Sequence, residues 1–113
     1  MSILADIQAA IKPLKIPAET GAFTENAPDR YIVLVPLVDS FELYADNAPG
    51  TEVHEARISM FCKGHYLSAK KAVVWALLSA DFTITDRRYN GYETETGYHH
   101  YVVDVAKIYG LEE

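Results

Sequence analysis

The chain is poor in cysteine and in long hydrophobic runs. Cys62 is the one cysteine among 113 residues, so no disulfide can form within the chain, and we expect an intracellular protein. No apolar run approaches the roughly 20 residues that cross a membrane. Residues 1–15 also lack the basic stretch and the long apolar core of an export signal. We therefore expect a protein that is neither exported nor anchored and that has no membrane partner.

Positive charge is scarce as well. The sequence has 10 lysines and arginines against 16 aspartates and glutamates, a net charge of −6, and its basic residues cluster no further than the pairs Lys70-Lys71 and Arg87-Arg88. Binding to nucleic acid depends on concentrated cations that displace counterions from the phosphates. We therefore expect no sequence-specific nucleic-acid partner.

The sequence contains no metal-binding motif. His99 and His100 are neighbours in the segment GYHHYVVDVAKIYG (97–110), which has strand character. Successive side chains of a strand point to opposite faces, so these two histidines cannot bind one metal ion unless the strand bulges. His54 and His65 offer no metal-binding spacing with them. We predict structural or surface roles for the histidines, with no metal site and no cofactor.

Cys62 is the remaining candidate for a nucleophile, since a histidine partner need only be close in space. The residue lies on the apolar stripe of a predicted strand, however, and burial in apolar surroundings makes a thiol less ionised. We therefore predict that Cys62 packs in the core and that the chain has no catalytic residue.

Hydrophobic residues make up half of the chain, and their spacing predicts a helix at the start. Ser2 precedes apolar residues at helical spacing and Pro13 ends the pattern, which predicts a helix over residues 3–12. Residues 16–30 are rich in proline, glycine and other turn formers. This segment is predicted to be a surface connection.

Strand patterns follow the connection. A β-branched run covers residues 31–35, and alternation resumes at 41–45 after Pro36, which an edge position or a bulge would tolerate. Residues 46–52 then supply turn formers. We predict a hairpin to the next strand.

That next segment, EVHEARISMFCKG (52–64), alternates cleanly between two faces. The predicted core side consists of His54, Ala56, Ile58, Met60 and Cys62. The wetter side consists of Glu55, Arg57 and Ser59.

A second helix is predicted over residues 66–80 by apolar residues at helical spacing, with Lys70 and Lys71 on the remaining side. The predicted apolar positions are Tyr66, Ala69, Val73, Val74, Leu77 and Leu78.

The last part of the chain returns to strand character. Residues 82–89 and 98–109 are predicted strands, and the turn formers between them, at 90–97, predict an antiparallel hairpin. The whole chain, residues 1–113, is predicted to be one α+β domain in the order α-β-β-β-α-β-β. Its sheet should be mostly antiparallel, with four to five strands and two helices on one face.

Arginine and tyrosine gather near the end of residues 82–89 and in the turn that follows. Arg87 and Arg88 stand beside Tyr89 and Tyr92, and both residue types are favoured in buried protein contacts. A protein contact is one interpretation of this cluster. An exposed strand end is the other.

The order of these elements carries a resemblance. It comprises the helix ILADIQAAI, the strand PDRYIVLVPL, the alternating EVHEARISMFCKG, the helix YLSAKKAVVWALLSADF and the closing ITDRRYNGYETETGYHHYVVDVAKIYG. Along nearly its whole length the chain resembles the tail-terminator, or tail-completion, proteins of long-tailed bacteriophages and prophages. Head-completion and neck connector proteins of phages share its size and composition and are the alternative family.

The resemblance implies a structural protein and not an enzyme. Such a protein forms a ring, often a hexamer, on the last ring of tail-tube subunits, ends tail growth and helps to join the tail to the head. Its partners would be copies of itself, the major tail tube protein and the head–tail connector protein. It would be found in the cytoplasm of the bacterial host during assembly and then in the tail or neck of the virion.

In such a ring the turns at 46–52 and 90–97 would reach neighbouring rings, since loops on a rigid sheet commonly carry contacts. The candidate contact residues are Asp46, Asn47, Arg87, Arg88, Tyr89, Tyr92, Glu93 and Glu95. Acidic groups facing a central channel would also repel DNA that passes through it.

Two other functions stay open at this point. One is a small hydrolase or metal-dependent enzyme that uses Cys62 with a histidine, or His54, His99 and His100 together. The other is a protein-binding regulator whose tyrosine-rich hairpin captures a cellular partner.

Overall fold

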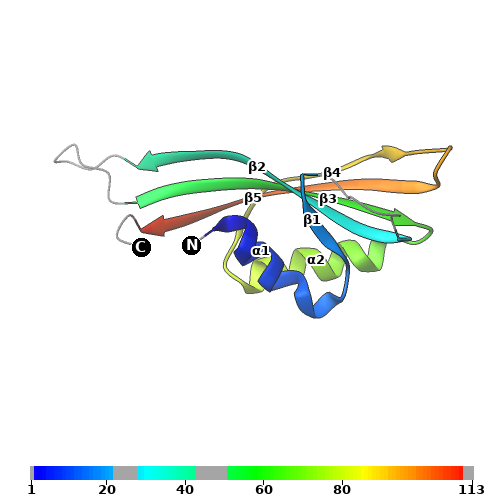
Figure 1. Cartoon of the computed structure of the whole chain (residues 1–113), viewed down its shortest axis with the longest axis horizontal. Coiled ribbons are helices and arrows are strands. Elements are labelled where there is room, and N and C mark those ends of the chain that lie inside the picture. Colours follow the sequence, from blue (N-terminus) through cyan, green and yellow to red (C-terminus); the bar gives the residue numbers. More distant parts are fainter. Residues whose placement is uncertain (1, 22–27, 43–50, 111–113) are drawn as a thin grey trace.

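The computed structural model describes residues 2–21, 28–42 and 51–110 as an α+β fold with a five-stranded sheet. Both helices lie on the same face of this sheet (Figure 1), which confirms the predicted α+β class. The elements are α1 (Ile3–Ile11), the short 3₁₀ helix η1 (Lys12–Leu14), β1 (Ala18–Thr20), β2 (Arg30–Glu42), β3 (Thr51–Lys63), α2 (Leu67–Ser79), β4 (Thr83–Tyr92) and β5 (Tyr98–Gly110).

The sheet is mixed, and the predicted antiparallel character holds for every strand pair except one. Its strand order is β1-β2-β3-β5-β4, with antiparallel pairs throughout except for β1, which runs parallel to β2. The segment 16–30, predicted to be only a surface connection, therefore contains a strand. Strand β1 is three residues long and too short to show an alternating pattern.

Strand β2 merges two segments that were predicted separately, 31–35 and 41–45. The register against β3 shifts between Pro36 and Val38, so a β-bulge accommodates the proline, as expected. Pro36 also lies beyond Leu34, where the pairing with β1 ends. The order α-β-β-β-α-β-β thus holds, but only the third of its first three strands, β3, is a predicted one. Strand β1 was not predicted, and β2 joins two predicted strands. Residues 43–45 of the predicted strand lie outside the described residues.

The β4–β5 hairpin turns later than predicted. Strand β4 continues through Asn90 and Gly91, and the register shift between Tyr89 and Gly91 shows that this Asn-Gly pair forms a bulge and not the turn. The turn is residues 93–97. Its backbone is fixed by Gly97, which has a φ of +82° and donates to the Glu93 carbonyl at 2.7 Å.

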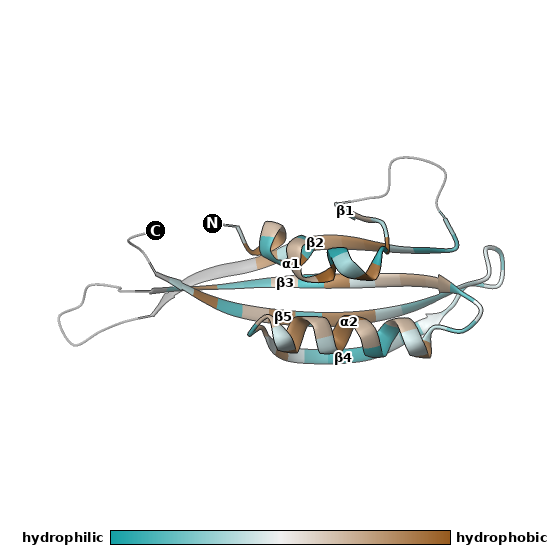
Figure 2. Cartoon of the chain, turned by 90° about the horizontal axis from the view of Figure 1, so that it is seen from below, coloured by the Kyte–Doolittle hydropathy of each residue, from teal (hydrophilic) through white to brown (hydrophobic). Residues whose placement is uncertain are grey.

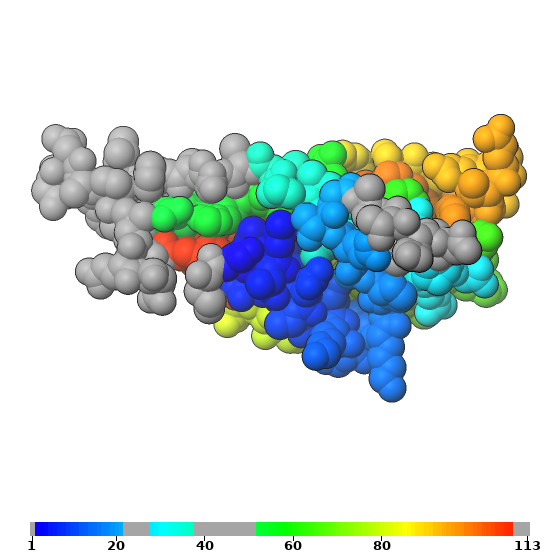
Figure 3. All heavy atoms as spheres, in the orientation of Figure 1, coloured from blue at the N-terminus to red at the C-terminus, as the bar shows by residue number. Residues whose placement is uncertain are grey.

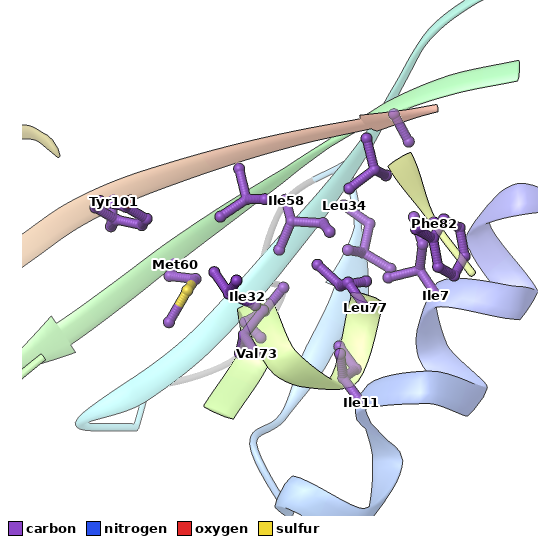
Figure 4. Close-up of a cluster of buried hydrophobic side chains, with 14 of the residues drawn as sticks. Ile7, Ile11, Ile32, Leu34, Ile58, Met60, Val73, Leu77, Phe82 and Tyr101 are labelled. Carbon is purple, nitrogen blue, oxygen red and sulfur yellow. The ribbon is translucent and has the colours of Figure 1, made fainter. Parts of the chain in front are cut away.

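The core lies between the sheet and the two helices (Figure 4). Helix α1 lies over β2, and α2 lies over β4 and β5 (Figure 2). The predicted alternation of β3 is confirmed for its central part, because the residues that face the helices are fully covered. The buried side chains of this layer include Ile7, Ile11, Ile32, Leu34, Ala56, Ile58, Met60, Cys62, Val73, Leu77, Val103 and Val105.

Helix α2 matches the predicted range but not the predicted apolar face at every position. Leu78, predicted to lie in the core, is 43% exposed. Lys70, predicted to lie on the polar side, is half-buried and places its ammonium group 5.0 Å from the centre of the Tyr101 ring. The solvent side of α2 is therefore more apolar than its sequence pattern suggested.

The molecule is elongated, at 54 × 25 × 24 Å (Figure 3). Its radius of gyration is 15.4 Å, against about 13 Å for a compact chain of this length. Strand length explains the difference, since 13 residues span about 43 Å as a strand and about 20 Å as a helix. Both ends of the sheet consequently extend past the helices (Figure 1). Within the described residues no helix is long and apolar enough to cross a membrane.

Candidate protein-binding surfaces

Aromatic side chains gather on the helix side of the sheet at the end near the β4–β5 turn. His99 stacks on Tyr66 with ring centroids 5.2 Å apart and lies 4.8 Å from the Tyr92 ring. The Tyr89 hydroxyl and His99 Nδ1 form a hydrogen bond of 2.8 Å. Tyr89 and Tyr92 nevertheless remain 45% and 52% exposed. His99 thus serves to hold two exposed tyrosines in place.

Helix α2 also exposes apolar side chains, along its outer side. Leu67, Trp75 and Leu78 fall within one arc of the helix, opposite the buried Ala69, Val73 and Leu77, and Trp75 is 66% exposed. In the described part of the chain, five of the seven exposed large apolar side chains belong to α2 and β4. We name this set the β4 flank: Leu67, Trp75, Leu78, Tyr89 and Tyr92.

The sequence analysis found the tyrosines of the β4 flank but missed its part on α2. The available signal was Trp75, which lies beside Lys71 on the side of the helix away from its buried residues. An exposed tryptophan at that position indicates a surface that a partner covers.

The predicted contact residues do not form one patch. The register of β4 places Arg87, Tyr89 and Tyr92 on the helix side of the sheet, and Arg88 on the opposite face. Glu93 and Glu95 lie in the turn at the tip of the hairpin. The remaining two, Asp46 and Asn47, lie outside the described residues.

The sheet face without helices carries a row of charges across three strands. Arg57 on β3 donates two hydrogen bonds to the Asp104 carboxylate, at 2.9 and 3.1 Å. Asp86 lies opposite Asp104 in the register of β4 and β5, and it pairs with Arg88. The arginines therefore neutralise two facing carboxylates, and Asp104 raises the pKa of Arg57 further. Arg88, a predicted contact residue, is engaged here within the chain.

The same face carries stacked rings at its aromatic end. Phe61 lies between Tyr31 and His100, with ring centroids 4.8 Å and 4.3 Å away. The Asn90 amide donates to His100 Nδ1 at 3.3 Å, so the neutral ring carries its proton on Nε2, which is buried without a partner among the described residues. Burial lowers the pKa of His100, assisted by Arg57 and Arg88 and opposed by Glu93.

This lowered pKa predicts a pH dependence of stability. As the pH falls below about 6.5, the unfolded chain takes up a proton on His100 before the folded chain does, so the free energy of unfolding decreases. One proton contributes at most about 1.4 kcal/mol per pH unit. In urea titrations between neutral and acidic pH, His100→Phe should keep the ring stack. Its free energy of unfolding should decrease less steeply as the pH falls than that of the wild type. An unchanged slope in this variant would contradict the assignment.

A hollow of about 650 Å³ lies between α1, η1 and β1, on the opposite edge of the sheet from β4. Its lining is apolar at Ala5, Ala9, Ile16 and Pro17, and basic at Lys12 and Lys15. We name it the α1 groove. The sequence analysis missed it, because it depends on β1 and on the left-handed conformation of Lys15, at φ 61°, which turns the chain back towards the sheet.

Helix α1, which forms one wall of the groove, is fixed to the sheet. The Tyr109 hydroxyl on β5 donates to the Asp6 carboxylate at 2.5 Å. Burial raises the pKa of Tyr109, and the bond to Asp6 raises it further. Ile3, Ile7 and Ile11 pack the same helix into the core. The groove is therefore a formed feature of the fold.

The structure does not bring the histidines together. His99 and His100 point to opposite faces, as predicted: His99 contacts Tyr66, and His100 stacks on Phe61. His54 bonds to Glu52 and lies eight residues from Cys62 along β3, or about 26 Å. Among the described residues, no group of three or more histidine, cysteine, aspartate and glutamate side chains could hold a metal ion.

Cys62 does have a histidine across the strand pair, since it is the register partner of His99. The thiol is 2% exposed, and burial raises its pKa. The ring nitrogen Nδ1 of His99 bonds to Tyr89. The predicted core packing of Cys62 is confirmed, and its thiol lacks the exposure that nucleophilic catalysis requires.

Burial of Cys62 predicts slow chemical modification. A disulfide reagent such as dithionitrobenzoate should label the folded chain at least about 100-fold more slowly than the chain in denaturant, because labelling needs an exposed thiolate. The absorbance of the thiolate that the reagent releases measures the rate of labelling. Rapid labelling of the folded chain would contradict this burial and revive a role for Cys62.

The fold and surfaces define a small α+β domain with an exposed aromatic and aliphatic flank at one edge of its sheet and a basic groove at the other. No protein-family model matches the chain, and no curated protein matches it. The resemblance to phage tail terminators therefore depends on the order of elements and on the motifs quoted above.

Proposed function

We propose that the chain is a structural subunit of a long-tailed phage or prophage, which caps the tail tube as a ring, ends tail growth and helps to join the tail to the head. The observation that carries the proposal is the β4 flank, whose large apolar side chains are exposed on an otherwise well-packed domain. The resemblance of the ordered elements supplies the kind of assembly. A ring of six copies is the stoichiometry that this resemblance implies.

The composition of the β4 flank favours a protein partner. Tryptophan and tyrosine dominate the energetics of protein interfaces, and a water-exposed apolar surface of this kind is stabilised when another protein covers it. The flank follows the outer side of a helix and an edge strand. A small-molecule site is usually a concave pocket that encloses its ligand, which is a different geometry.

The elongated shape supports the same proposal. Strand ends that extend past the helices bury less of their own surface than a compact domain does. Neighbouring subunits and neighbouring rings would cover these ends. The net charge of −6 also suits a ring around passing DNA, because carboxylates repel phosphates.

Sedimentation and native mass measurements test the proposal. The chain alone should form one closed species as its concentration rises, and it should bind the ends of purified phage tail tubes. Trp75→Ser should weaken this assembly without lowering the free energy of unfolding, since the side chain is 66% exposed. Ile108→Ser is the matched control, because Ile108 is 59% exposed but lies outside the β4 flank.

Two outcomes would contradict the proposed function. One is a chain that stays monomeric at every concentration and in the presence of tail tubes. The other is binding to the head–tail connector alone, which would assign the chain to the head-completion or neck class.

A further inference from the structure

We propose that one contact between neighbouring subunits of the ring is a junction in which the β4–β5 hairpin tip of one copy docks in the α1 groove of the next copy. The hairpin tip is Tyr92 with the turn 93–97. This inference rests on the proposed function, because it names the surfaces through which the subunits of that ring bind each other.

The hairpin tip is acidic, apolar at one side and fixed in shape. Glu93 and Glu95 are both exposed, and the Tyr92 ring is 52% exposed. Hydrogen bonds hold the turn: Thr96 Oγ1 donates to Glu93 Oε1 at 2.7 Å, and the Glu93 N–H donates to the Tyr98 carbonyl at 2.9 Å. A preformed loop loses little conformational entropy when it docks.

The α1 groove has the complementary character. Lys12 and Lys15 are exposed at its basic side, and neither forms an ion pair with another residue of the described part of the chain. The apolar wall of Ala5, Ala9 and Pro17 would receive the Tyr92 ring. Opposite charges attract more strongly near a protein surface than in bulk water, so the two lysines favour an acidic occupant.

Half of the ten lysines and arginines of this acidic chain are engaged with groups of their own chain. Five of them bind a carboxylate, lie over an aromatic ring or do both: Arg57, Lys63, Lys70, Arg88 and Lys107. The groove instead presents two lysines side by side next to an apolar wall. An acidic loop with an aromatic residue, as the hairpin tip provides, matches both parts of this lining.

The positions of the two surfaces favour a second copy of this chain as the occupant. Strands β1 and β4 are the two edges of the sheet, so the groove beside β1 and the hairpin of β4 lie at opposite edges. The tip and the α1–β1 segment are well separated on the molecular surface (Figure 3). Two unlike, complementary surfaces on one subunit produce head-to-tail contacts, which close into a ring when the rotation between copies allows it.

An exchange of charges tests the junction. Glu95→Lys and Lys15→Glu each bring like charges together at every junction, and each should weaken self-association roughly tenfold at low salt. The double variant, with both substitutions in one chain, restores opposite charges and should recover wild-type association. An equimolar mixture of the two single variants should also assemble. Sedimentation velocity measures the association, and circular dichroism checks that each variant is folded.

Glu55→Lys is the control for net charge. It changes the charge of the chain as Glu95→Lys does, but Glu55 lies on the face without helices, outside both surfaces. This variant should associate like the wild type. Equal weakening by Glu55→Lys and Glu95→Lys would show a general charge effect and overturn the proposal.

The remaining outcomes separate this inference from the proposed function. Wild-type self-association that neither Glu95→Lys nor Lys15→Glu weakens would overturn the junction and leave the ring in place. A wild-type chain that stays monomeric, with or without tail tubes, would overturn the ring and the junction together.

Discussion

Ile58→Ala is expected to lower the free energy of unfolding by about 3 kcal/mol. Ile58 lies at the centre of β3 with 0% of its surface exposed, and its register partners Leu34 and Val103 on the two flanking strands are equally buried. Alanine would leave a cavity in the layer that the helices cover, and close packing prevents the neighbours from filling it. A domain of this kind has a free energy of unfolding of about 5–15 kcal/mol, so this one change removes a large fraction of its stability.

Urea denaturation followed by circular dichroism measures this loss, at concentrations where the chain is monomeric. Ile58→Val, which removes one methyl group, should cost about 1 kcal/mol. Ile108→Ala is the exposed counterpart on β5 and should cost less than about 0.5 kcal/mol. Equal losses for Ile58→Ala and Ile108→Ala would show that Ile58 is not in the core.

Arg57→Leu is expected to lower the free energy of unfolding by about 2 kcal/mol. The Asp104 side chain is 11% exposed and receives both hydrogen bonds of the Arg57 guanidinium. Leucine would leave this carboxylate without a partner and opposite a second carboxylate, Asp86, in the next strand. An unpaired charge with so little access to water is strongly destabilising.

The double variant Arg57→Leu with Asp104→Leu distinguishes the loss of the ion pair itself from the cost of leaving one buried charge unpaired. Two apolar side chains of similar size need no hydrogen bond, so we expect the double variant to be more stable than Arg57→Leu alone. Chemical denaturation of the wild type, the two single variants Arg57→Leu and Asp104→Leu, and the double variant completes the double-mutant cycle. A single variant as stable as the wild type would mean that the pair contributes nothing measurable.

The long periodic elements could be predicted from the sequence. Residues 66–80 and 53–63 carry many apolar residues at a regular spacing, so packing against the core and local propensity favour the same structure there. The bulge at Pro36 was predicted for a similar reason, since proline lacks the donor that a regular ladder requires. Residues 53–63 and 66–80 supply eight of the 17 buried residues in the core cluster.

The parts that were missed depend on contacts between distant segments. Strand β1 has only three residues, and its pairing with β2 is decided by how α1 and η1 place it. At Asn90-Gly91 the local signal for a tight turn was real, but β5 continues to pair with β4 beyond it, and the two residues form a bulge. Tertiary pairing overrode the local preference in both places.

The candidate site was only partly predicted, because it too depends on contacts between distant segments. Neighbours in sequence were treated as one cluster, but strand alternation places Arg87 and Arg88 on opposite faces. Tyr89 and Tyr92 do lie on the same side of the sheet. The exposed face of α2 includes Leu78, which the helical periodicity had assigned to the core. The α1 groove needed the fold itself, because its walls come from three separate elements.

The irregular shape of β4 affects how this edge of the sheet can pair with other chains. An outer strand offers free amides and carbonyls to any extended chain, which is how fibrous aggregates begin. In β4 the ladder is broken after Ile84 and again after Tyr89, and the paired charges of Asp86 and Arg88 stand between the breaks. A regular ribbon cannot stack on such an edge. This edge of the sheet is therefore protected against pairing with another extended chain.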